Sequence, residues 1–371
     1  MFHKVAKIEL FATGRGGTFV EHKIRARPGR WADATAPQRR RRTGHQRRRH
    51  GSSVSERGDV QTTIARPVRF SGIGLHGARP VTMTVRPASA HSGIRFRRVD
   101  AGDVVIPALW NRAEAATLCT RIGDGRGVSV STIEHLMAAL AGCGIVNALI
   151  DIDAEEVPIL DGSAAPFVAA FLRTGLRRLD APLRAIRVLA PLEVSHGAAR
   201  AVLEPAEALE IAFAIDFEDR AIGAQTLALP MANGAFVREL SDSRTFCRLR
   251  DVETMRARGL ALGGSFENAV VVDGPRVLSP GGLRHRDEPV RHKMLDALGD
   301  LSLAGAPLLA RYTGIRAGHA LTVALLHRLF ATPAAWEWVT LDDAALARLP
   351  GAGLGPLSEV RPAAGGLLAA G

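Results

Sequence analysis

The chain has 371 residues, of which 47% are apolar, enough to bury a large core and to form two domains. No apolar run approaches the roughly 20 residues of a membrane-spanning helix, and the N-terminus lacks the apolar core of a secretory signal. The net charge of +11 falls almost entirely in residues 1–60, which hold 15 Lys+Arg against 5 Asp+Glu. Residues 61–371 hold 33 against 32, so their charge balance does not indicate a nucleic-acid-binding domain.

Residues 1–60 form a basic extension, with arginine runs at 39–42 and 47–49. Such runs repel one another and bury little apolar surface, so we expect this segment to be disordered. Two other interpretations stay open. The segment could be an arm that binds nucleic acid or an anionic membrane, or the start codon could lie too far upstream, so that residues 1–58 are absent from the mature protein.

The three cysteines are scattered and offer neither a CxxC pair nor a disulfide framework. They suit a reducing compartment, so we expect a cytoplasmic protein with no transmembrane segment.

The first half of the ordered chain, from about residue 62, mixes strands with helices. Hydrophobic patterns predict strands at residues 68–70, 81–85, 94–96, 128–130 and 147–153. Helices are predicted to begin near Thr132 and after Ser163, the second with Pro166 in its first turn. The charged residues 174–187 are predicted to form a linker.

Residues 72–77, Gly-Ile-Gly-Leu-His-Gly, match the GxGxxG pattern of dinucleotide-binding sites. Such a site requires a helix directly after the glycines, so that the helix N-terminus meets the pyrophosphate. Here Pro80 and the alternating residues 81–85 follow, which predict a strand. The glycines are therefore interpreted as hairpin turn residues, and a Rossmann domain is excluded.

The second half repeats the mixture of strands and helices. Strands are predicted at residues 201–203, 210–217, 269–272 and 308–312, and helices at 250–258, 290–304 and 318–331. Residues 351–371, rich in Gly and Ala, are expected to be a flexible tail. Strands grouped beside helices without strict alternation favour two α+β layered domains, residues 61–183 and 184–350.

His292 and Asp296 lie four residues apart, on one face of a predicted helix, at the spacing of a metal chelate. Glu134-His135 is a second candidate site, and together these residues offer two imidazoles and one carboxylate. Three protein ligands leave one tetrahedral position for water, as in catalytic zinc sites, and Glu134 could serve as the base. The alternatives are a simple polar pair for His292 and Asp296, and a capping box between Ser131 and Glu134.

His319 stands at a predicted helix start, where the helix dipole lowers the basicity of histidine. A nearby carboxylate such as Asp300 would be needed to keep it protonated. A single histidine in this position is more often structural.

Taken together, these segments resemble a known family, the zinc-dependent UDP-3-O-acyl-N-acetylglucosamine deacetylases of lipid A biosynthesis. The resemblance covers roughly residues 62–345. The matching strings are Ser71-Gly-Ile-Gly-Leu-His-Gly77, Leu118-Cys-Thr120, Ser131-Thr-Ile-Glu-His135, Pro158-Ile-Leu-Asp-Gly-Ser-Ala-Ala-Pro-Phe167, Ser243-Arg-Thr-Phe246, Arg258-Gly-Leu260, Gly263-Gly-Ser265, Val290-Arg-His-Lys-Met-Leu-Asp-Ala-Leu-Gly-Asp300 and Ala317-Gly-His-Ala-Leu321.

The resemblance implies roles for individual residues. The implied metal ligands are His135, His292 and Asp296, which would hold one Zn²⁺, a site that Fe²⁺ could also occupy. The implied catalytic residues are Glu134 as general base, His319 as catalytic histidine, Thr245 at the oxyanion, Lys293, and Asp300 beside His319. The implied substrate-binding residues are Phe246, Lys293, Arg316, Leu260 and Gly264.

The resemblance also implies two similar two-layer α+β sandwich domains, each with an insert, and an active site between them. The second insert, near residues 259–278, would form an apolar passage for an acyl chain. The implied reaction removes the N-acetyl group of UDP-3-O-(3-hydroxyacyl)-N-acetylglucosamine, a small UDP-sugar lipid precursor, and the enzyme is expected to be a monomer that binds no nucleic acid. The alternatives are a zinc amidohydrolase for another N-acylated sugar, or a nucleic-acid-binding module that uses the Arg-rich segment.

Overall fold

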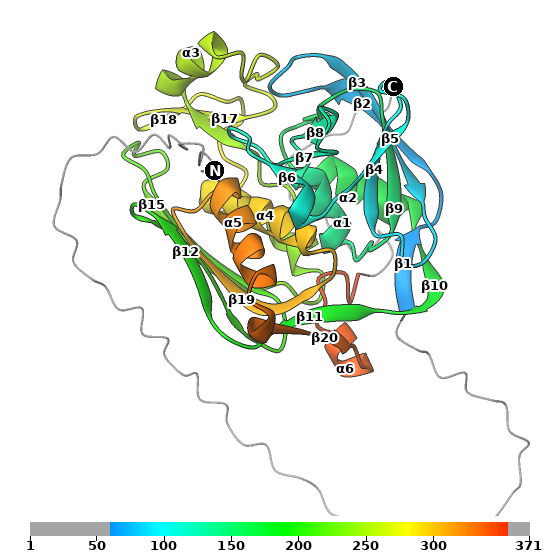
Figure 1. Ribbon diagram of the computed structural model, residues 1–371. Helices are drawn as coiled ribbons and strands as arrows, with labels where there is room; N and C mark the ends of the chain where they lie inside the picture. The colour runs from blue at the N-terminus through cyan, green and yellow to red at the C-terminus, as the bar shows by residue number, and fades with distance from the viewer. Residues whose placement is uncertain (1–59, 355–371) are drawn as a thin grey trace, which may run out of the picture. The chain divides into compact units, whose positions relative to one another are not determined.

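The computed structural model describes residues 60–354, so the basic extension up to residue 59 and residues 355–371 lie outside the described part. The first half is built on a five-stranded mixed sheet (Figure 1). Its strands, in spatial order, are β2 (Val68–Ile73), β3 (Pro80–Pro87), β9 (Ala148–Ile152), β4 (Ile94–Arg98) and β5 (Val104–Pro107). Strands β2 and β3 form the predicted hairpin around the glycines, and no dinucleotide-binding helix follows them.

Two helices pack with this sheet, α1 (Glu134–Gly142) and α2 (Ala165–Thr174). Helix α1 is buried along almost its whole length, which fits its apolar sequence. Helix α2 has Pro166 in its first turn, as predicted. A smaller sheet precedes α1, made of β6 (Ala113–Glu114), β7 (Arg121–Gly123) and β8 (Ser129–Ser131).

The prediction of a linker at residues 174–187 is wrong. Residues Leu176–Pro182 form strand β10, which pairs antiparallel with β1 (Val60–Ile64), and β11 (Arg184–Val188) follows directly. Most side chains of β10 are exposed and only Ala181 is buried, so its charges face solvent. A two-stranded ribbon of this kind needs no apolar alternation, which is why the charged sequence concealed it.

The second half is built on a seven-stranded sheet. Five of its strands pair in the order β12 (Leu192–His196), β13 (Ala199–Pro205), β19 (Leu308–Ile315), β11 and β20 (Trp336–Thr340). The other two extend from β19: β14 (Glu210–Asp216) pairs with β19, and β15 (Ala224–Pro230) pairs with β14. Helices α4 (Glu288–Leu301) and α5 (His319–Phe330) pack together and contact this sheet. Both helices begin within two residues of their predicted positions.

A three-stranded sheet stands apart from both large sheets, with β16 (Phe246–Arg248), β17 (Val270–Asp273) and β18 (Arg276–Val277). Helix α3 (Leu249–Ala257) lies beside it and has no buried residue. The short elements are the π-helical turn Phe236–Leu240, α6 (Asp343–Leu346) and the 3-10 turns Trp110–Arg112, Ser302–Ala304 and Pro333–Ala335. Among the described residues, no helix has the length and apolarity to cross a bilayer.

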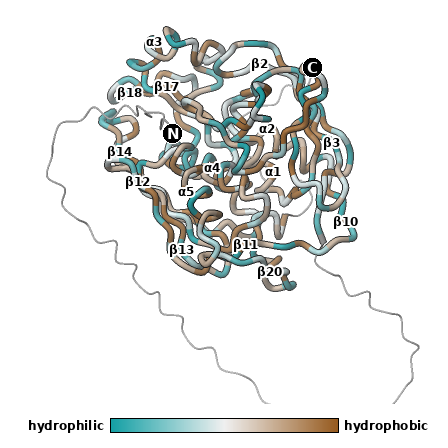
Figure 2. Tube along the Cα trace, viewed as in Figure 1, coloured by the Kyte–Doolittle hydropathy of each residue, from teal (hydrophilic) through white to brown (hydrophobic). Residues whose placement is uncertain are grey.

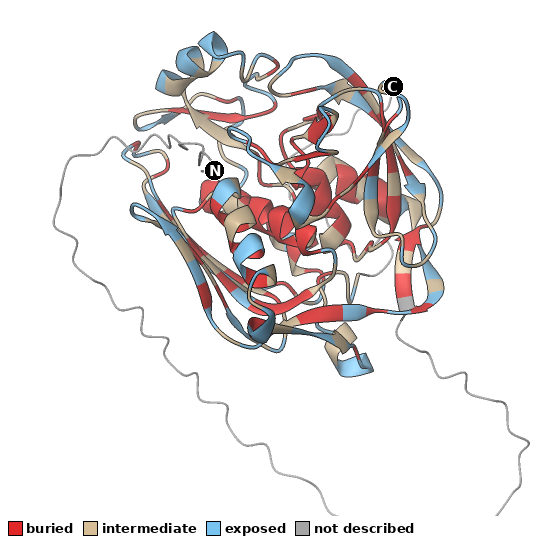
Figure 3. Ribbon diagram, in the orientation of Figure 1, coloured by how far each residue is buried: buried red, intermediate tan, exposed pale blue. Residues whose placement is uncertain are grey.

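Helices α1 and α4 lie against each other at the centre of the described chain (Figure 1), and Figure 3 shows both as largely buried. Figure 2 shows hydrophobic residues in the helices and strands on both sides of this contact. A Cβ on Gly299 of α4 would stand 2.1 Å from the carbonyl oxygen of Glu134, so only glycine permits this approach. The described residues belong to one compact unit, and the division at residues 183 and 184 stays a prediction.

The C-terminal end of the described chain is packed. Leu354 lies against the main core, and a Cβ on Gly351 would stand 2.5 Å from the Cα of Gly144. The first residues of the predicted tail are therefore in contact with the body of the protein, and residues 355–371 lie outside the described range.

Candidate metal centre

Helices α1 and α4 bring two histidines and one aspartate together. His135 lies in the first turn of α1, while His292 and Asp296 lie one turn apart on α4. Ligand atoms of the three residues all lie within 4.8 Å of one another, and all three residues are buried. The sequence prediction that these distant segments converge is consistent with this geometry.

The two carboxylate oxygens of Asp296 have different neighbours. Oδ2 accepts from Nζ of Lys293 at 2.7 Å, whereas Oδ1 lies 3.3 Å from Nε2 of His292 and 3.6 Å from Nε2 of His135. Oδ1 is buried and has no hydrogen-bond partner. A buried carboxylate oxygen without a partner is costly, so its place beside two imidazole nitrogens fits a metal ion. The buried group of His135, His292 and Asp296 suits a metal.

The electrostatic surroundings of His292 and Asp296 favour the protonation states that metal binding requires. Burial lowers the pKa of His292 to about 4, so its imidazole is neutral at neutral pH. Burial would raise the pKa of Asp296, but His292 and Lys293 outweigh it and hold that pKa well below its usual value. Burial opposes the charge of Lys293 too, but the adjacent Asp296 raises the pKa of this lysine. A neutral imidazole and an ionised carboxylate are the forms that bind a divalent cation.

A hydrogen bond to a backbone carbonyl fixes the orientation of the His292 imidazole. Its Nδ1 lies 3.0 Å from the carbonyl oxygen of Ser243, which can only accept a hydrogen bond. Nδ1 therefore carries the hydrogen, and Nε2 keeps its lone pair toward His135 and Asp296. The ring of Phe246 packs edge-on against His292, with centroids 6.2 Å apart.

Glu134 does not take part in the capping box considered above. Ser131 donates its hydroxyl to the carbonyl of Glu155, and no side chain caps α1. Oε2 of Glu134 instead accepts from the amide of Thr120 at 3.0 Å. Burial raises the pKa of Glu134, which makes it a stronger base than an exposed glutamate.

His319 opens α5 and faces the same group of residues. Its Nδ1 donates to Oδ2 of Asp300 at 2.9 Å, and its Nε2 lies 3.9 Å from both Oε1 of Glu134 and Oδ2 of Asp296. Burial would lower the pKa of His319, but Asp300, Asp296 and Glu134 outweigh it and raise that pKa to about 9. His319 is therefore an imidazolium at neutral pH, held by the carboxylate that the sequence had pointed to.

Thr245 belongs to the segment that supports His292. It is half-buried, two residues after Ser243, and its backbone bonds to Gly162 and Val270. Gly162 needs its φ of +83°, and a Cβ there would stand 2.0 Å from the carbonyl oxygen of Asn268. This close approach joins the loop before α2 to the strands β16 and β17.

Arg316, which the family resemblance implies as a substrate-binding residue, lies just before α5. Its guanidinium forms an ion pair with Asp216 at the end of β14. Its backbone is left-handed, with φ of +50°, and its amide donates to the carbonyl of Ala214.

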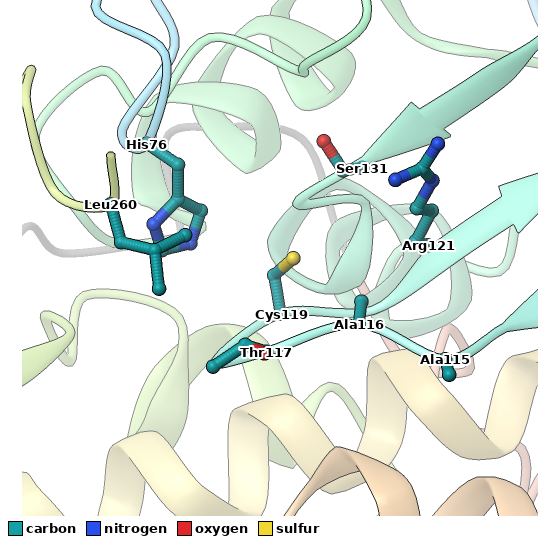
Figure 4. A pocket seen from close by; sticks show the side chains of 8 residues that line it. All are labelled: His76, Ala115, Ala116, Thr117, Cys119, Arg121, Ser131 and Leu260. Atoms are coloured by element: carbon teal, nitrogen blue, oxygen red, sulfur yellow. The ribbon is translucent and has the colours of Figure 1, made fainter. Parts of the chain in front are cut away.

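A cavity of about 290 Å³ opens beside the hairpin of β2 and β3. Figure 4 shows His76 and Leu260 on one side of it, facing Thr117 and Cys119 on the other. The predicted residue Leu260 therefore lines a cavity. Gly264, also predicted to bind substrate, accepts at its carbonyl from Arg256 at 3.4 Å and donates its amide to the carbonyl of Ala261.

Sequence reasoning assigned no role to Thr120, Ser243 or Glu156. Glu156 is buried and accepts from the amides of His76 and Gly77 and from the hydroxyl of Thr132. Thr132 has a φ of +56°, a conformation that β-branched residues rarely adopt. The one signal for these contacts was that Thr120 and Ser243 stand inside the strings that carry the family resemblance.

Two buried imidazoles and a carboxylate, faced by a second carboxylate and a protonated imidazole, form the arrangement found in metal-dependent hydrolases. The profile of the UDP-3-O-acyl N-acetylglycosamine deacetylase family (LpxC) matches residues 61–331. The UDP-3-O-acyl-N-acetylglucosamine deacetylase of Phenylobacterium zucineum is 51% identical over 285 residues, which cover 76% of this chain and 97% of that protein. This chain belongs to the UDP-3-O-acyl N-acetylglycosamine deacetylase family.

Two further relatives with the same name agree with this assignment. The protein of Idiomarina loihiensis is 45% identical over 286 residues, covering 76% of this chain and 94% of its own length. The protein of Shewanella halifaxensis is 43% identical over 288 residues, covering 77% and 94%.

Proposed function

We propose that this chain hydrolyses the N-acetyl group of UDP-3-O-acyl-N-acetylglucosamine, a step of lipid A biosynthesis, releasing acetate and a free amine. The observation that carries the proposal is the partnerless Oδ1 of Asp296, buried between His135 and His292 inside the span of the family match. These three residues would hold one zinc ion, and Fe²⁺ is the other candidate. A bound divalent ion supplies a Lewis acid that polarises the amide carbonyl and lowers the pKa of water.

Glu134 would act as the general base. Its carboxylate is fixed by the amide of Thr120, and burial raises its pKa, so it can take a proton from the water that attacks the amide carbon. A positioned base of this kind contributes about 10²–10⁴-fold to the rate.

His319 would act as the acid. Its Nε2 lies 3.9 Å from Oε1 of Glu134, and Asp300 holds its Nδ1 hydrogen. As an imidazolium it can donate a proton to the departing amine, which otherwise leaves poorly. The hydroxyl of Thr245 would donate to the oxyanion, as the family resemblance implies, and a placed donor of this kind is worth about 3 kcal/mol.

Substrate recognition would divide by chemistry. Lys293 and Arg316 would meet sugar and diphosphate oxygens, while Leu260, Gly264 and Phe246 would line the passage for the acyl chain. The exposed side chains Leu262 and Phe266, 47% and 43% accessible, lie in the same segment. Burying apolar surface of the acyl chain would contribute about 25 cal/mol per Å².

We also propose that residues 61–183 and 184–350 are two α+β sandwich domains with the active site between them. Each half has its own large sheet, and α1 from one half meets α4 from the other. The sheet of β6, β7 and β8 would be the insert of the first domain, and the insert of the second, near residues 259–278, would include β17 and β18.

The test combines an acetate-release assay with metal analysis. Wild type should release acetate, and chelation should abolish release until zinc or iron is restored. Glu134→Ala should keep its metal and lose at least about 100-fold of its turnover, since a general base is worth that much. His292→Ala should lose both metal and turnover, whereas the control His196→Ala, at an exposed position in β12, should lose neither.

A substrate without the 3-O-acyl chain distinguishes the proposed deacetylase from an amidohydrolase that acts on another N-acylated sugar. The proposal predicts poor turnover of that substrate. Equal turnover of both substrates would favour an amidohydrolase for another N-acylated sugar, and full activity of Glu134→Ala would overturn the site.

A further inference from the structure

Thr120 is a buried residue with three polar groups, the backbone amide, the hydroxyl and the backbone carbonyl. The amide and the hydroxyl bond to residues of the candidate active site, and the carbonyl bonds to the residue before helix α1. Its amide donates to Oε2 of Glu134 at 3.0 Å, and its hydroxyl donates to Oδ1 of Asp300 at 2.5 Å. Its carbonyl oxygen accepts from the amide of Ile133, the residue before α1, at 3.4 Å. Only 3% of Thr120 is accessible, so bulk water cannot replace these bonds.

These contacts belong to a nearly closed ring of four residues. Asp300 receives the Thr120 hydroxyl on Oδ1 and binds Nδ1 of His319 with Oδ2 at 2.9 Å. Nε2 of His319 then lies 3.9 Å from Oε1 of Glu134, whose other oxygen returns to Thr120. Three sides of the ring are hydrogen bonds. The fourth side is too long for a hydrogen bond and lies between the proposed base and the proposed acid.

We propose that Thr120 is a positioning residue that sets the distance between Glu134 and His319. Thr120 binds Glu134 through its amide, and through its hydroxyl it binds Asp300, which in turn binds His319. The separation of the two proton-transfer groups then depends on the fixed covalent geometry of a single threonine. This inference rests on the proposed deacetylation.

The ring also explains why a threonine suits this position. Asp300 and Thr120 are 180 residues apart in the chain, and Asp300 is only 1% accessible. A buried carboxylate oxygen that lost its donor would turn toward another partner or take up a proton. Either change would move the imidazole of His319, because the same carboxylate holds its Nδ1.

The direct test replaces the hydroxyl by a methyl group in Thr120→Val, which keeps the amide bond to Glu134. We expect kcat to fall at least tenfold, KM to stay within twofold, and the bound metal to remain stoichiometric. Thr120→Ser restores the hydroxyl and should keep at least half of the wild-type kcat. If Thr120→Val does not fold, Thr120→Ala makes the same comparison without adding an atom to the site.

A matched control separates positioning from stability. Thr63 is fully buried, donates its hydroxyl to the carbonyl of Asn147 at 2.7 Å and accepts from the amide of Ala88 at 2.9 Å. Thr63→Val should lower the Tm as much as Thr120→Val does, yet leave kcat unchanged.

Two further measurements test the route through Asp300. In Asp300→Ala, adding Thr120→Val should lower kcat by less than twofold, because no side-chain oxygen is left to connect Thr120 with His319. In zinc-loaded protein without substrate, the Nδ1 proton resonance of His319 should shift in Thr120→Val and stay in place in Thr63→Val. This NMR comparison holds even if the acetate assay fails, so the two proposals fail separately.

Retention of more than half of kcat in Thr120→Val, additive losses in the double variant, or an unshifted resonance would each overturn the inference.

Discussion

His319 and Asp300 form a hydrogen-bonded pair that we expect to set the pH range of the proposed reaction. Burial would lower the pKa of His319, but the carboxylates around it raise that pKa to about 9. The imidazolium is therefore fully formed at neutral pH and is lost as the pH rises through about 9. Proton donation to the leaving amine should disappear over the same interval.

The pH–rate profile of kcat/KM checks this assignment. We expect an alkaline limb above neutral pH and no higher than about pH 9 in the wild type, since the pKa of His319 is about 9 without a metal ion and a nearby divalent cation lowers it. Asp300→Asn removes a carboxylate that raises this pKa, so the limb should move toward lower pH and the maximum rate should fall. An alkaline limb that stays in place in Asp300→Asn would show that another group limits the rate.

The same pair contributes to stability with a defined sign. A group whose pKa is higher in the folded state binds its proton more tightly there. The stabilisation from His319 is fully present below its ordinary value of 6.5 and is lost as the pH rises to about 9. Thermal unfolding of the metal-free protein should therefore show a lower Tm at pH 9.5 than at pH 6.5, with a smaller difference in Asp300→Asn.

At the scale of elements, the site depends on how closely α4 approaches α1. Alanine in place of a helical glycine normally stabilises a protein by about 1 kcal/mol. At Gly299 the added Cβ would lie 2.1 Å from the carbonyl oxygen of Glu134, so the two helices must move apart. Gly299→Ala should instead destabilise the protein by about 1–3 kcal/mol, as overpacked cores do.

Metal affinity separates this effect from a general loss of stability. Because His135 and the pair His292 and Asp296 lie on opposite helices, Gly299→Ala should weaken zinc binding at least tenfold in a competition titration. The control is Gly142→Ala at the far end of α1, where the new Cβ would meet the Phe236 ring at 2.0 Å. It should cost stability but keep zinc affinity, and equal affinities in both variants would contradict the argument.

A buried ion pair fixes the start of α4. Glu288 is completely buried and accepts from Nε of Arg244 at 2.9 Å and from the amides of Arg244 and Arg284. Arg244 follows Ser243, whose carbonyl orients His292, so the ion pair links the segment that supports His292 to the helix that carries His292. Removing one partner of a buried pair costs about 3–5 kcal/mol, because it leaves the other charge unpaired.

Urea unfolding checks the size of this contribution. Glu288→Gln should lower the free energy of unfolding by about 3 kcal/mol or more. The control Glu210→Gln breaks the exposed pair with Arg311, 40% and 53% accessible, and exposed pairs are worth about 0–1 kcal/mol. Similar losses in both variants would mean that burial does not strengthen the Glu288 pair.

The sequence predicted those parts of the site that follow from local spacing. His292 and Asp296 share a helix face because they are four residues apart, and the helix start at His319 follows from the apolar pattern after it. The links from Thr120 to Asp300 and from Ser243 to His292 span 180 and 49 residues, and no local pattern encodes such contacts. Strand β10 was missed for the related reason that its partner β1 lies more than 110 residues away.

For the whole molecule, the basic segment can be separated from the proposed activity. The family match begins at residue 61, and the Phenylobacterium relative aligns over 97% of its own length with 76% of this chain. Deleting residues 1–58 therefore removes nothing that the family match covers. We expect the shortened chain to keep kcat and KM within about twofold, a change of less than about 0.5 kcal/mol.

The same deletion should change solubility and polyanion binding. It leaves 33 Lys+Arg against 33 Asp+Glu, so the net charge falls from +11 to zero. A chain without net charge associates more readily, so the shortened protein should be less soluble near neutral pH than the full chain. Salt-sensitive binding to RNA or heparin, if the full chain shows any, should be lost, because it would depend on the deleted arginines. A shortened chain that retained nucleic-acid binding but lost deacetylation would instead favour the nucleic-acid-binding interpretation and contradict an enzyme contained in residues 59–371.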